Sequence, residues 1–403
     1  MLNLRTALVS ILLVLVLLPN ATRAAAPTKL EFSGWLPYWR VASSTRDVMP
    51  HLNQLTEVNP FGYTVKKDGS LNDAAKVSAP EWQELFKAAK AQKVRVVPTV
   101  MWSDADAIHA VLSDKTLRTK HVASIISMVT SNNFDGVDID YEGKRASDRE
   151  NYTAFLKELS AAFAKSKANK WLMCTIEART PPKDLYKTIP ADLEYVNDFK
   201  AINKYCDRVR LMTYDQQQAD LTLNKANKGL YAPVADTAWV RKVVLLAAKD
   251  INKKKLVLGV ATYGYIYQVM PDVDGGYEYN LLEAFNPKYG TDIAKEYGIT
   301  PVRTSSGEMY FTYVPKDTPN GLPDNATVSA KAPKGTVHAL KAALGASALA
   351  KEKGTQAPFY MLWWSDAKAI EDKVKLAREL GIRGVAVFKF DGGEDPGMWG
   401  VLK

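Results

Sequence analysis

The sequence predicts an α/β fold, namely a (β/α)8 TIM barrel with a small α+β insertion between its seventh and eighth strands. Short apolar runs alternate with segments of helical pattern along the 403-residue chain, as expected of repeated strand–helix units. Eight runs can be distinguished, mostly about 25–50 residues apart, which is enough for one strand, one helix and their loops. The runs are centred near Leu36, Phe61, Val97, Val137, Met173, Met212, Leu258 and Val387.

Helix start and stop signals lie between these runs. Ser78 and Glu81 have the spacing of a capping box that leads into a helix over 82–93. Asp366 is a suitable N-cap for the last helix of the chain, and Gly381 can end that helix in a left-handed conformation. These signals support helices between the strand-like runs.

The interval between the runs at Leu258 and Val387 is too long for one helix and its loops. We therefore predict an α+β insertion domain, 266–357, in the loop after the seventh strand. In TIM barrels the loops after the strands build the active site, so the insertion would form one wall of a substrate groove. Its strand-like pieces are Met309–Val314 and Phe359–Trp364, and its helical pieces lie near Leu281–Tyr297 and Ala339–Lys351.

Residues 1–24 predict a secretory signal peptide. Arg5 supplies a basic start, Ala7–Leu18 form an apolar stretch, and Thr22 and Ala24 are small residues before a cleavage site. The apolar stretch, about 12 residues, is too short to span a bilayer, and a retained signal anchor is the alternative. Since no later segment is apolar for long enough to cross a membrane, we expect a secreted or extracytoplasmic protein.

The mature chain is moderately basic, and its catalytic barrel is predicted over 28–403. Signal removal deletes Arg5 and Arg23 but no acid, so the formal net charge falls from +9 to +7. Lysines are spread along the chain without a dense block beyond Lys253–Lys255, which argues against nucleic-acid binding. The charge is ordinary for a soluble protein and would also suit an anionic cell wall. Because no separate association element is visible, we expect a monomer.

Residue types that bind metals show no site-like spacing. Cys174 and Cys206 can form a disulfide in an exported chain, or remain two buried thiols, since both adjoin apolar runs. The histidines stand far apart, and none has a ligand-like spacing to another histidine or a cysteine. We therefore predict neither a metal nor a cofactor. The histidines are His51, His109, His121 and His338.

The segment Phe134–Glu142 carries the most information about function, because acids alternate in it with apolar residues. Side chains of a strand alternate between two faces. Asp138, Asp140 and Glu142 therefore share one face, with Glu142 at the strand tip, while the apolar residues between them face the helices. Burying three carboxylates is costly because each loses water and repels the others, so stability alone does not explain the pattern.

The three acids have a chemical use. Close carboxylates cannot all ionise freely, so one of them is held protonated at neutral pH. A protonated Glu142 would be a general acid, the group that glycoside hydrolysis needs at the leaving oxygen. The alternatives are a divalent-metal site built from the same acids, a structural polar network and a solvated acidic edge, which the apolar neighbours disfavour.

The acidic segment resembles the Asp-Gly-x-Asp-x-Asp-x-Glu signature of glycoside hydrolase family 18, the chitinase-type enzymes. Every fixed position is matched, by Asp135, Gly136, Asp138, Asp140 and Glu142. Further segments resemble the family in the same order over nearly all of the mature chain, and the long seventh-to-eighth connection resembles the insertion domain of one branch. These segments are Gly34–Trp39, Asn59–Phe61, Leu211–Asp215 and Tyr263–Gly264, at the first, second, sixth and seventh strands.

The resemblance implies retaining hydrolysis that is assisted by the N-acetyl group of the substrate. Glu142 would protonate the glycosidic oxygen and later act as a base toward water. Asp140 would orient the acetamide and stabilise the charged intermediate, sharing a proton with Asp138. Tyr214 would hydrogen-bond to the acetamide, with Asp215 beside it. This mechanism needs no metal.

Aromatic side chains at or just past the predicted strand ends indicate a sugar groove, because flat rings suit the apolar faces of pyranoses. For any one ring, core packing is the alternative. By resemblance Met212 would pack under the sugar, and Phe388 stands where the family usually has Trp as the floor under the scissile residue; Phe keeps an apolar floor with less area. The predicted substrate-binding residues are Trp39, Phe61, Tyr63, Trp102, Met212, Tyr263 and Phe388.

We therefore predict a secreted glycosidase that cleaves β-1,4 linkages in a polysaccharide containing N-acetylglucosamine, with chitin or chitooligosaccharides as the default substrate. Peptidoglycan or spore-wall glycan is the alternative, because some bacterial branches of the family act there and the ending Gly392–Pro396 with Trp399 resembles theirs. A lectin-like, non-catalytic chitin-binding protein is a second alternative, although such relatives typically lack the catalytic glutamate that Glu142 supplies here. A metal-stabilised binding module is a third, and it predicts chelator-sensitive melting.

Overall fold

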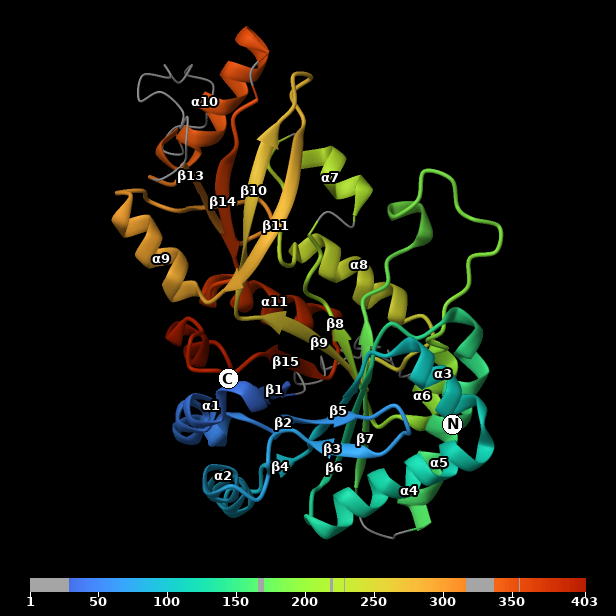
Figure 1. The fold of residues 1–403 in the computed structure, drawn as a ribbon. Coiled ribbons are helices and arrows are strands. Elements are labelled where there is room, and N and C mark those ends of the chain that lie inside the picture. The colour runs from blue at the N-terminus through green and yellow to red at the C-terminus, as the bar shows by residue number, and fades with distance from the viewer. Residues whose placement is uncertain (1–28, 166–169, 218–219, 228, 317–336, 355) are drawn as a thin grey trace, which may run out of the picture.

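The computed structural model describes residues 29–165, 170–217, 220–227, 229–316, 337–354 and 356–403. The predicted signal peptide, 1–24, lies outside the described residues. Figure 1 shows a barrel of strands surrounded by helices, with a second sheet above it in the view. None of the helices in the described ranges is both long and apolar enough to cross a bilayer.

Eight parallel strands form the barrel, which confirms the predicted fold class. Each strand is hydrogen-bonded to its neighbour, and β1 pairs with both β15 and β2, so that the sheet closes on itself. Two short strands extend this sheet: β4 (Arg95–Val96) is parallel to β2, and β3 (Leu71–Asp73) is antiparallel to its end. The barrel strands are β1 (Glu31–Pro37), β2 (Glu57–Val65), β5 (Thr99–Trp102), β6 (Gly136–Tyr141), β7 (Trp171–Glu177), β8 (Arg208–Met212), β9 (Leu256–Ala261) and β15 (Gly384–Phe388).

Helices surround the barrel, and the main hydrophobic core lies between them and the outward faces of the strands. The helices of this layer are α1 (Val41–Val48), α2 (Pro80–Ala91), α3 (Ala105–Ser113), α4 (Lys115–Ser131), α5 (Arg149–Lys165), α6 (Phe199–Tyr205), α8 (Thr237–Ala247) and α11 (Ala367–Leu380), and α7 (Leu221–Asn227) lies higher in the view. Short 3-10 turns are η1 (Tyr38–Arg40), η2 (Met49–Gln54), η3 (Ala146–Asp148), η4 (Pro182–Asp184) and η5 (Pro396–Gly400).

The helix caps agree only partly with the sequence signals. As predicted, Asp366 caps α11 by accepting from the Ala369 amide, and Gly381 ends this helix with φ +66°. The predicted capping box before α2 is wrong, because Ala79 is the N-cap and no side chain bonds there. Proline at the first helical position has no amide hydrogen, so one fewer donor needs a partner at this end.

The second sheet lies between β9 and β15 in the sequence and is antiparallel, with the order β11-β10-β14-β13-β12. Its first strand begins three residues after β9 ends, and β14 ends at Trp364. The sheet therefore extends past the predicted bounds 266–357 at both ends. At the N-terminal end the reason is that β9 and β10 follow each other as one apolar run. The strands and helices are β10 (Gly264–Pro271), β11 (Tyr277–Phe285), α9 (Pro287–Glu296), β12 (Val302–Arg303), β13 (Met309–Tyr313), α10 (Val337–Lys353) and β14 (Phe359–Trp364).

One predicted helix in this region is partly wrong. The segment Leu281–Tyr297 was expected to be helical, but its first part belongs to β11, which pairs with β10 throughout. The helix α9 begins only at Pro287, after the N-cap Asn286. Pairing with β10 overrides the local helix propensity of this segment. Leu281 and Leu282 therefore lie on an edge strand, where each is 42% exposed.

Cys174 of β7 and Cys206 at the end of α6 form a disulfide. Both residues are buried in the main core. The sequence alone had left open whether they form a disulfide or remain free thiols. The link joins a barrel strand to the helix that leads into the next strand.

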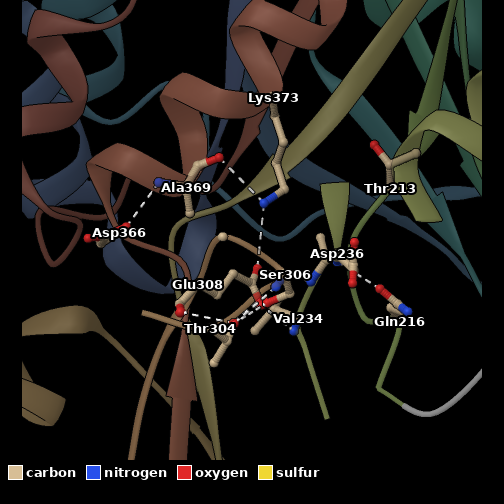
Figure 2. Close-up of polar contacts among 12 residues, drawn as sticks. Thr213, Gln216, Val234, Asp236, Thr304, Ser306, Glu308, Asp366, Ala369 and Lys373 are labelled. Carbon is tan, nitrogen blue, oxygen red and sulfur yellow. Dashed lines mark hydrogen bonds and ion pairs between the residues drawn. The ribbon is translucent and has the colours of Figure 1, made fainter. Parts of the chain in front are cut away.

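A buried carboxylate, Glu308, joins the second sheet to the barrel (Figure 2). Its side chain accepts hydrogen bonds from the backbone amides of Val234 at 2.8 Å and Ala235 at 3.0 Å, and from Trp363 Nε1 at 3.0 Å. Lys373 of α11 lies 3.6 Å away, and both charged side chains are 0% exposed. Burial raises the pKa of the Glu308 carboxyl, and the nearby Lys373 ammonium opposes this rise.

Replacing Glu308 by Ala should strongly destabilise the protein. The change leaves a buried ammonium at Lys373 and two backbone amides without their acceptor, and breaking such a pair costs about 3–5 kcal/mol. Adding Lys373→Met should restore part of this loss. Urea unfolding followed by tryptophan fluorescence measures the effect, with Glu278→Ala on the exposed face of β11 as control; a loss as small as the control's would contradict this role.

Candidate active site

Asp138 is the innermost acid of β6 and is fully buried. Four donors surround its carboxylate: Trp35 Nε1 at 3.0 Å, Thr99 Oγ1 and Thr175 Oγ1 at 2.8 Å each, and Arg210 Nη1 at 3.1 Å. These residues come from β1, β5, β7 and β8. Charge-assisted hydrogen bonds of this kind are strong, so the barrel holds Asp138 from several sides.

Arg210 continues this network toward the bottom of the barrel. It is 0% exposed, and its Nη2 donates to Asn59 Oδ1 at 2.6 Å, Glu57 Oε1 at 3.0 Å and Ser33 Oγ at 3.3 Å. The guanidinium also stacks over the Trp35 ring at 4.6 Å. One arginine thus lies between two carboxylates in the barrel interior and offsets their burial.

Asp140 lies one step above Asp138 on the same face of β6 and is 4% exposed. Its Oδ1 is buried and has no hydrogen-bond partner among the described residues. Burial is the largest cause that raises its pKa well above the ordinary value, and the carboxylates of Glu142 and Asp138 add to it. The charged form of Asp140 is therefore disfavoured.

Glu142 follows the last residue of β6 and is partly exposed. Its backbone amide donates to Trp102 O at 2.8 Å, which continues the pairing with β5. Burial raises the pKa of its carboxyl, as do the nearby acids Glu177 and Asp215, whereas Lys144 lowers it. Glu142 thus has the position and the proton affinity of a general acid.

Tyr214 and Asp215 follow β8 and face the same end of the barrel. Asp215 has a backbone φ of +57°. Its Oδ1 accepts hydrogen bonds from the hydroxyls of Tyr263 at 2.6 Å and Tyr265 at 2.5 Å. Burial raises the pKa of Asp215, and the two tyrosines oppose this shift. Gly259 lets Tyr214 lie close, since a Cβ at this position would be 2.7 Å from the Tyr214 ring.

The floor of the site is apolar. Phe388 at the end of β15 stacks on Tyr214 with ring centroids 5.5 Å apart, and it meets Trp35 and Phe61 edge-on. Met212 packs against the cluster that contains Tyr214 and Phe388. The structure therefore brings the predicted residues Phe61, Met212, Tyr263 and Phe388 together beside the acids.

An open cavity of about 530 Å³ lies beside Asp215. Trp39 forms part of its wall, is 48% exposed and contacts Phe61 edge-on. Strands β10 and β11 of the second sheet supply another part of the wall. Lining residues include Trp39, Arg40, Asp215, Tyr263, Tyr265, Glu283, Tyr289, Phe388 and Asp391.

Two predicted sugar contacts lie elsewhere. Tyr63 packs against Phe134 in the outer core, because the register of β2 shifts between Phe61 and Tyr63 and turns Tyr63 outward. Trp102 also faces the helices, where it contacts Tyr141 and His121 edge-on or tilted at 5.4 Å. Both residues were expected in the groove because they lie near strand ends, a criterion that ignores which face of the strand they occupy.

The residues that hold the acids were not among the predicted site residues. Arg210 stands just before the recognised Leu211–Asp215 segment, and an arginine within an apolar strand is a signal that could have been used. Thr99 and Thr175 have no comparable signal. In the described part of the chain, no three His, Cys, Asp or Glu side chains are grouped as a metal site.

Several known proteins are similar to this chain. The family model described as "Glycosyl hydrolases family 18" matches residues 34–393. A glycosylase of Bacillus subtilis, YvbX, is 23% identical over 74% of this chain and 70% of its own length. A cortical fragment-lytic enzyme of Bacillus anthracis is 21% identical over 90% and 70%. The crystal structure of a chitinase from Chromobacterium violaceum has a TM-score of 0.67 and 17% identity, covering 93% of this chain and 98% of that one.

Replacing Asp140 by Asn should stabilise the protein at neutral and alkaline pH. A group whose pKa is raised on folding contributes stability below its unfolded pKa, and this is lost as the pH rises through the folded pKa. The variant should therefore gain on the order of 1 kcal/mol or more at pH 8 relative to pH 4, at about 1.4 kcal/mol per pKa unit.

Urea unfolding at both pH values measures this gain. Asp68→Asn is the control, because hydrogen bonds from Ser70 lower the pKa of Asp68 and the sign should reverse. An Asp140 variant whose relative stability does not rise with pH would contradict the buried-acid arrangement.

Trp39→Ala and Trp102→Ala should have opposite consequences. Trp39 is half exposed in the groove, so its removal should weaken oligosaccharide binding and change stability by about 1 kcal/mol or less. Trp102 is 2% exposed, so its removal should cost about 3–5 kcal/mol and leave binding by the folded protein unchanged. Calorimetric titration and urea unfolding separate the two, and equal effects on binding would place Trp102 at the groove after all.

Proposed function

Because the chain belongs to glycosyl hydrolase family 18, we propose that it hydrolyses the β-1,4 bond that follows an N-acetylglucosamine residue in chitin or chitooligosaccharides. The observation that carries this proposal is the stack of Asp138, Asp140 and Glu142 on one face of β6. Only the outermost, Glu142, is partly exposed, and its pKa is raised. Such a group is suited to protonate a leaving oxygen.

In the first step Glu142 donates its proton to the glycosidic oxygen. The carbonyl oxygen of the substrate's own N-acetyl group attacks the anomeric carbon, the glycosidic bond breaks, and the leaving chain departs as an alcohol. Asp140 accepts the acetamide N–H and stabilises the positive charge of the cyclic oxazolinium ion. Asp138 supports Asp140 from below. The Tyr214 hydroxyl donates to the acetamide oxygen.

In the second step the ionised Glu142 takes a proton from water, whose oxygen attacks the anomeric carbon from the side that the leaving group occupied. The bond between the anomeric carbon and the acetamide oxygen breaks, which restores the N-acetyl group. The two inversions give net retention. The hydroxyls of Tyr263 and Tyr265 both donate to Asp215 Oδ1 and hold this carboxylate in place.

A wall glycan is the second candidate substrate. Relatives of this chain include cortical fragment-lytic enzymes, and one of them aligns with 90% of it. The polysaccharide is the proposed partner, and the protein acts as a secreted monomer. A lectin-like role is less well supported because the acids for catalysis are in place.

Glu142→Gln should lower hydrolysis by about 10²–10⁴-fold, the contribution of a general acid. Product release is measured from chitin oligomers and from purified peptidoglycan side by side, and the cleaved polymer identifies the substrate. Glucosamine oligomers should resist cleavage because they lack the acetamide, and chelators should not change the rate. If the wild type binds both polymers but cleaves neither, the enzymatic proposal is wrong and a lectin-like role is favoured.

A further inference from the structure

Lys144 and Glu177 lie beside Glu142 and are not part of the acidic signature. Lys144 follows Glu142 by two residues, and Glu177 is the last residue of β7, the strand next to β6. Lys144 Nζ and Glu177 Oε2 are 3.5 Å apart. The mechanism above gives neither residue a role.

Lys144 is an unusual residue for this position, because its side chain is 0% exposed. The ammonium donates to Tyr141 O and lies 4.9 Å from the centre of the Tyr152 ring. Burial lowers the pKa of Lys144, and the nearby carboxylates of Glu177 and Asp140 oppose this shift. A buried ammonium is costly unless it is paired, so Lys144 depends on Glu177 and the acids of β6.

Glu177 fixes the turn that carries Glu142. Its Oε1 accepts from the Gly143 amide at 3.1 Å, and its Oε2 accepts from Asn197 Nδ2 at 2.7 Å. Gly143 has φ +62°, a conformation that glycine adopts without strain. Since the Glu142 amide is bonded to Trp102 O, the backbone is held on both sides of the acid.

We propose that Glu177 and Lys144 are positioning residues that fix the turn after Glu142 and set the electric field at its carboxyl group. This inference rests on the proposed role of Glu142 as the acid. The two residues carry opposite charges, so they act on the Glu142 proton in opposite directions. They do not touch the reacting bond.

The other charged groups around Glu142 are unchanged in the test variants. Asp140 faces it from the same strand, and Asp215 faces it from the end of β8. Removing the negative charge of Glu177 should therefore make Glu142 a stronger acid, and removing the positive charge of Lys144 should make it a weaker one. A role in packing alone would not predict shifts of opposite sign.

The test measures the pH dependence of kcat/KM, whose alkaline limb reports the pKa of the general acid. Glu177→Gln should move this limb to lower pH by about one unit, and Lys144→Met should move it to higher pH by a similar amount. The double variant should return close to the wild type. Glu194→Gln, an exposed acid on the same β7–α6 segment, should leave the limb in place.

Positioning is separated from charge by Glu177→Ala. Glutamine keeps an oxygen for the Gly143 amide, whereas alanine removes it, so Glu177→Ala should lower kcat by roughly ten- to a hundredfold below Glu177→Gln. Equal kcat values for these two variants would overturn the positioning role. If Lys144→Met does not fold, the two Glu177 variants still decide the proposal.

A readout without turnover keeps this inference separate from the proposed function. In protein labelled with carboxyl-13C glutamate, the Glu142 resonance is the one missing from Glu142→Gln, and its titration gives the pKa directly. Opposite shifts in Glu177→Gln and Lys144→Met support the pair even if no polymer is cleaved. An active enzyme whose Glu142 titration is unchanged in both variants would overturn the inference while the proposed function stands.

Discussion

The contact between Asp138 and Arg210 lies at the centre of the barrel, and the active site is built on it. A carboxylate at the centre of a closed barrel loses its water, so it needs donors from the surrounding strands. Arg210 at 3.1 Å, two threonines and Trp35 supply them from four strands of the barrel. Because each donor comes from a different strand, the site forms only when the barrel closes.

Above this base the acids are progressively less well paired. Asp138 has four donors, Asp140 has one buried oxygen without a partner in the described residues, and Glu142 is partly exposed. The raised pKa of Asp140 and of Glu142 follows from this gradient, since burial without donors disfavours the charged form. Burial without donors thus costs stability at neutral pH, and it raises proton affinity in the way that the proposed acid role of Glu142 requires.

The second sheet also holds the segment that follows β8. Tyr265 of β10 donates to Asp215, and Glu308 before β13 bonds the Val234–Ala235 amides. The Gln216 amide in turn donates to Val234 O at 2.9 Å. The segment after β8, which carries Tyr214 and Asp215, is therefore held by the barrel on one side and by the inserted sheet on the other (Figure 2).

The barrel, the positions of seven of its eight strands and the shared face of the acids on β6 were predictable from the sequence, because apolar spacing and strand alternation are local properties. The run near Val97 missed its strand, because Val97 lies between β4 and the barrel strand β5. The acid role of Glu142 followed from the alternating acids and was sharpened by the resemblance, whereas the roles of Asp140 and Tyr214 came from the resemblance; all three remain proposals. Only the tertiary structure turned Tyr63 and Trp102 away from the groove, placed Arg210 under Asp138 and brought Glu177 to Gly143. A register shift in β2 or a contact between neighbouring strands depends on pairing across long sequence separations, which no local pattern encodes.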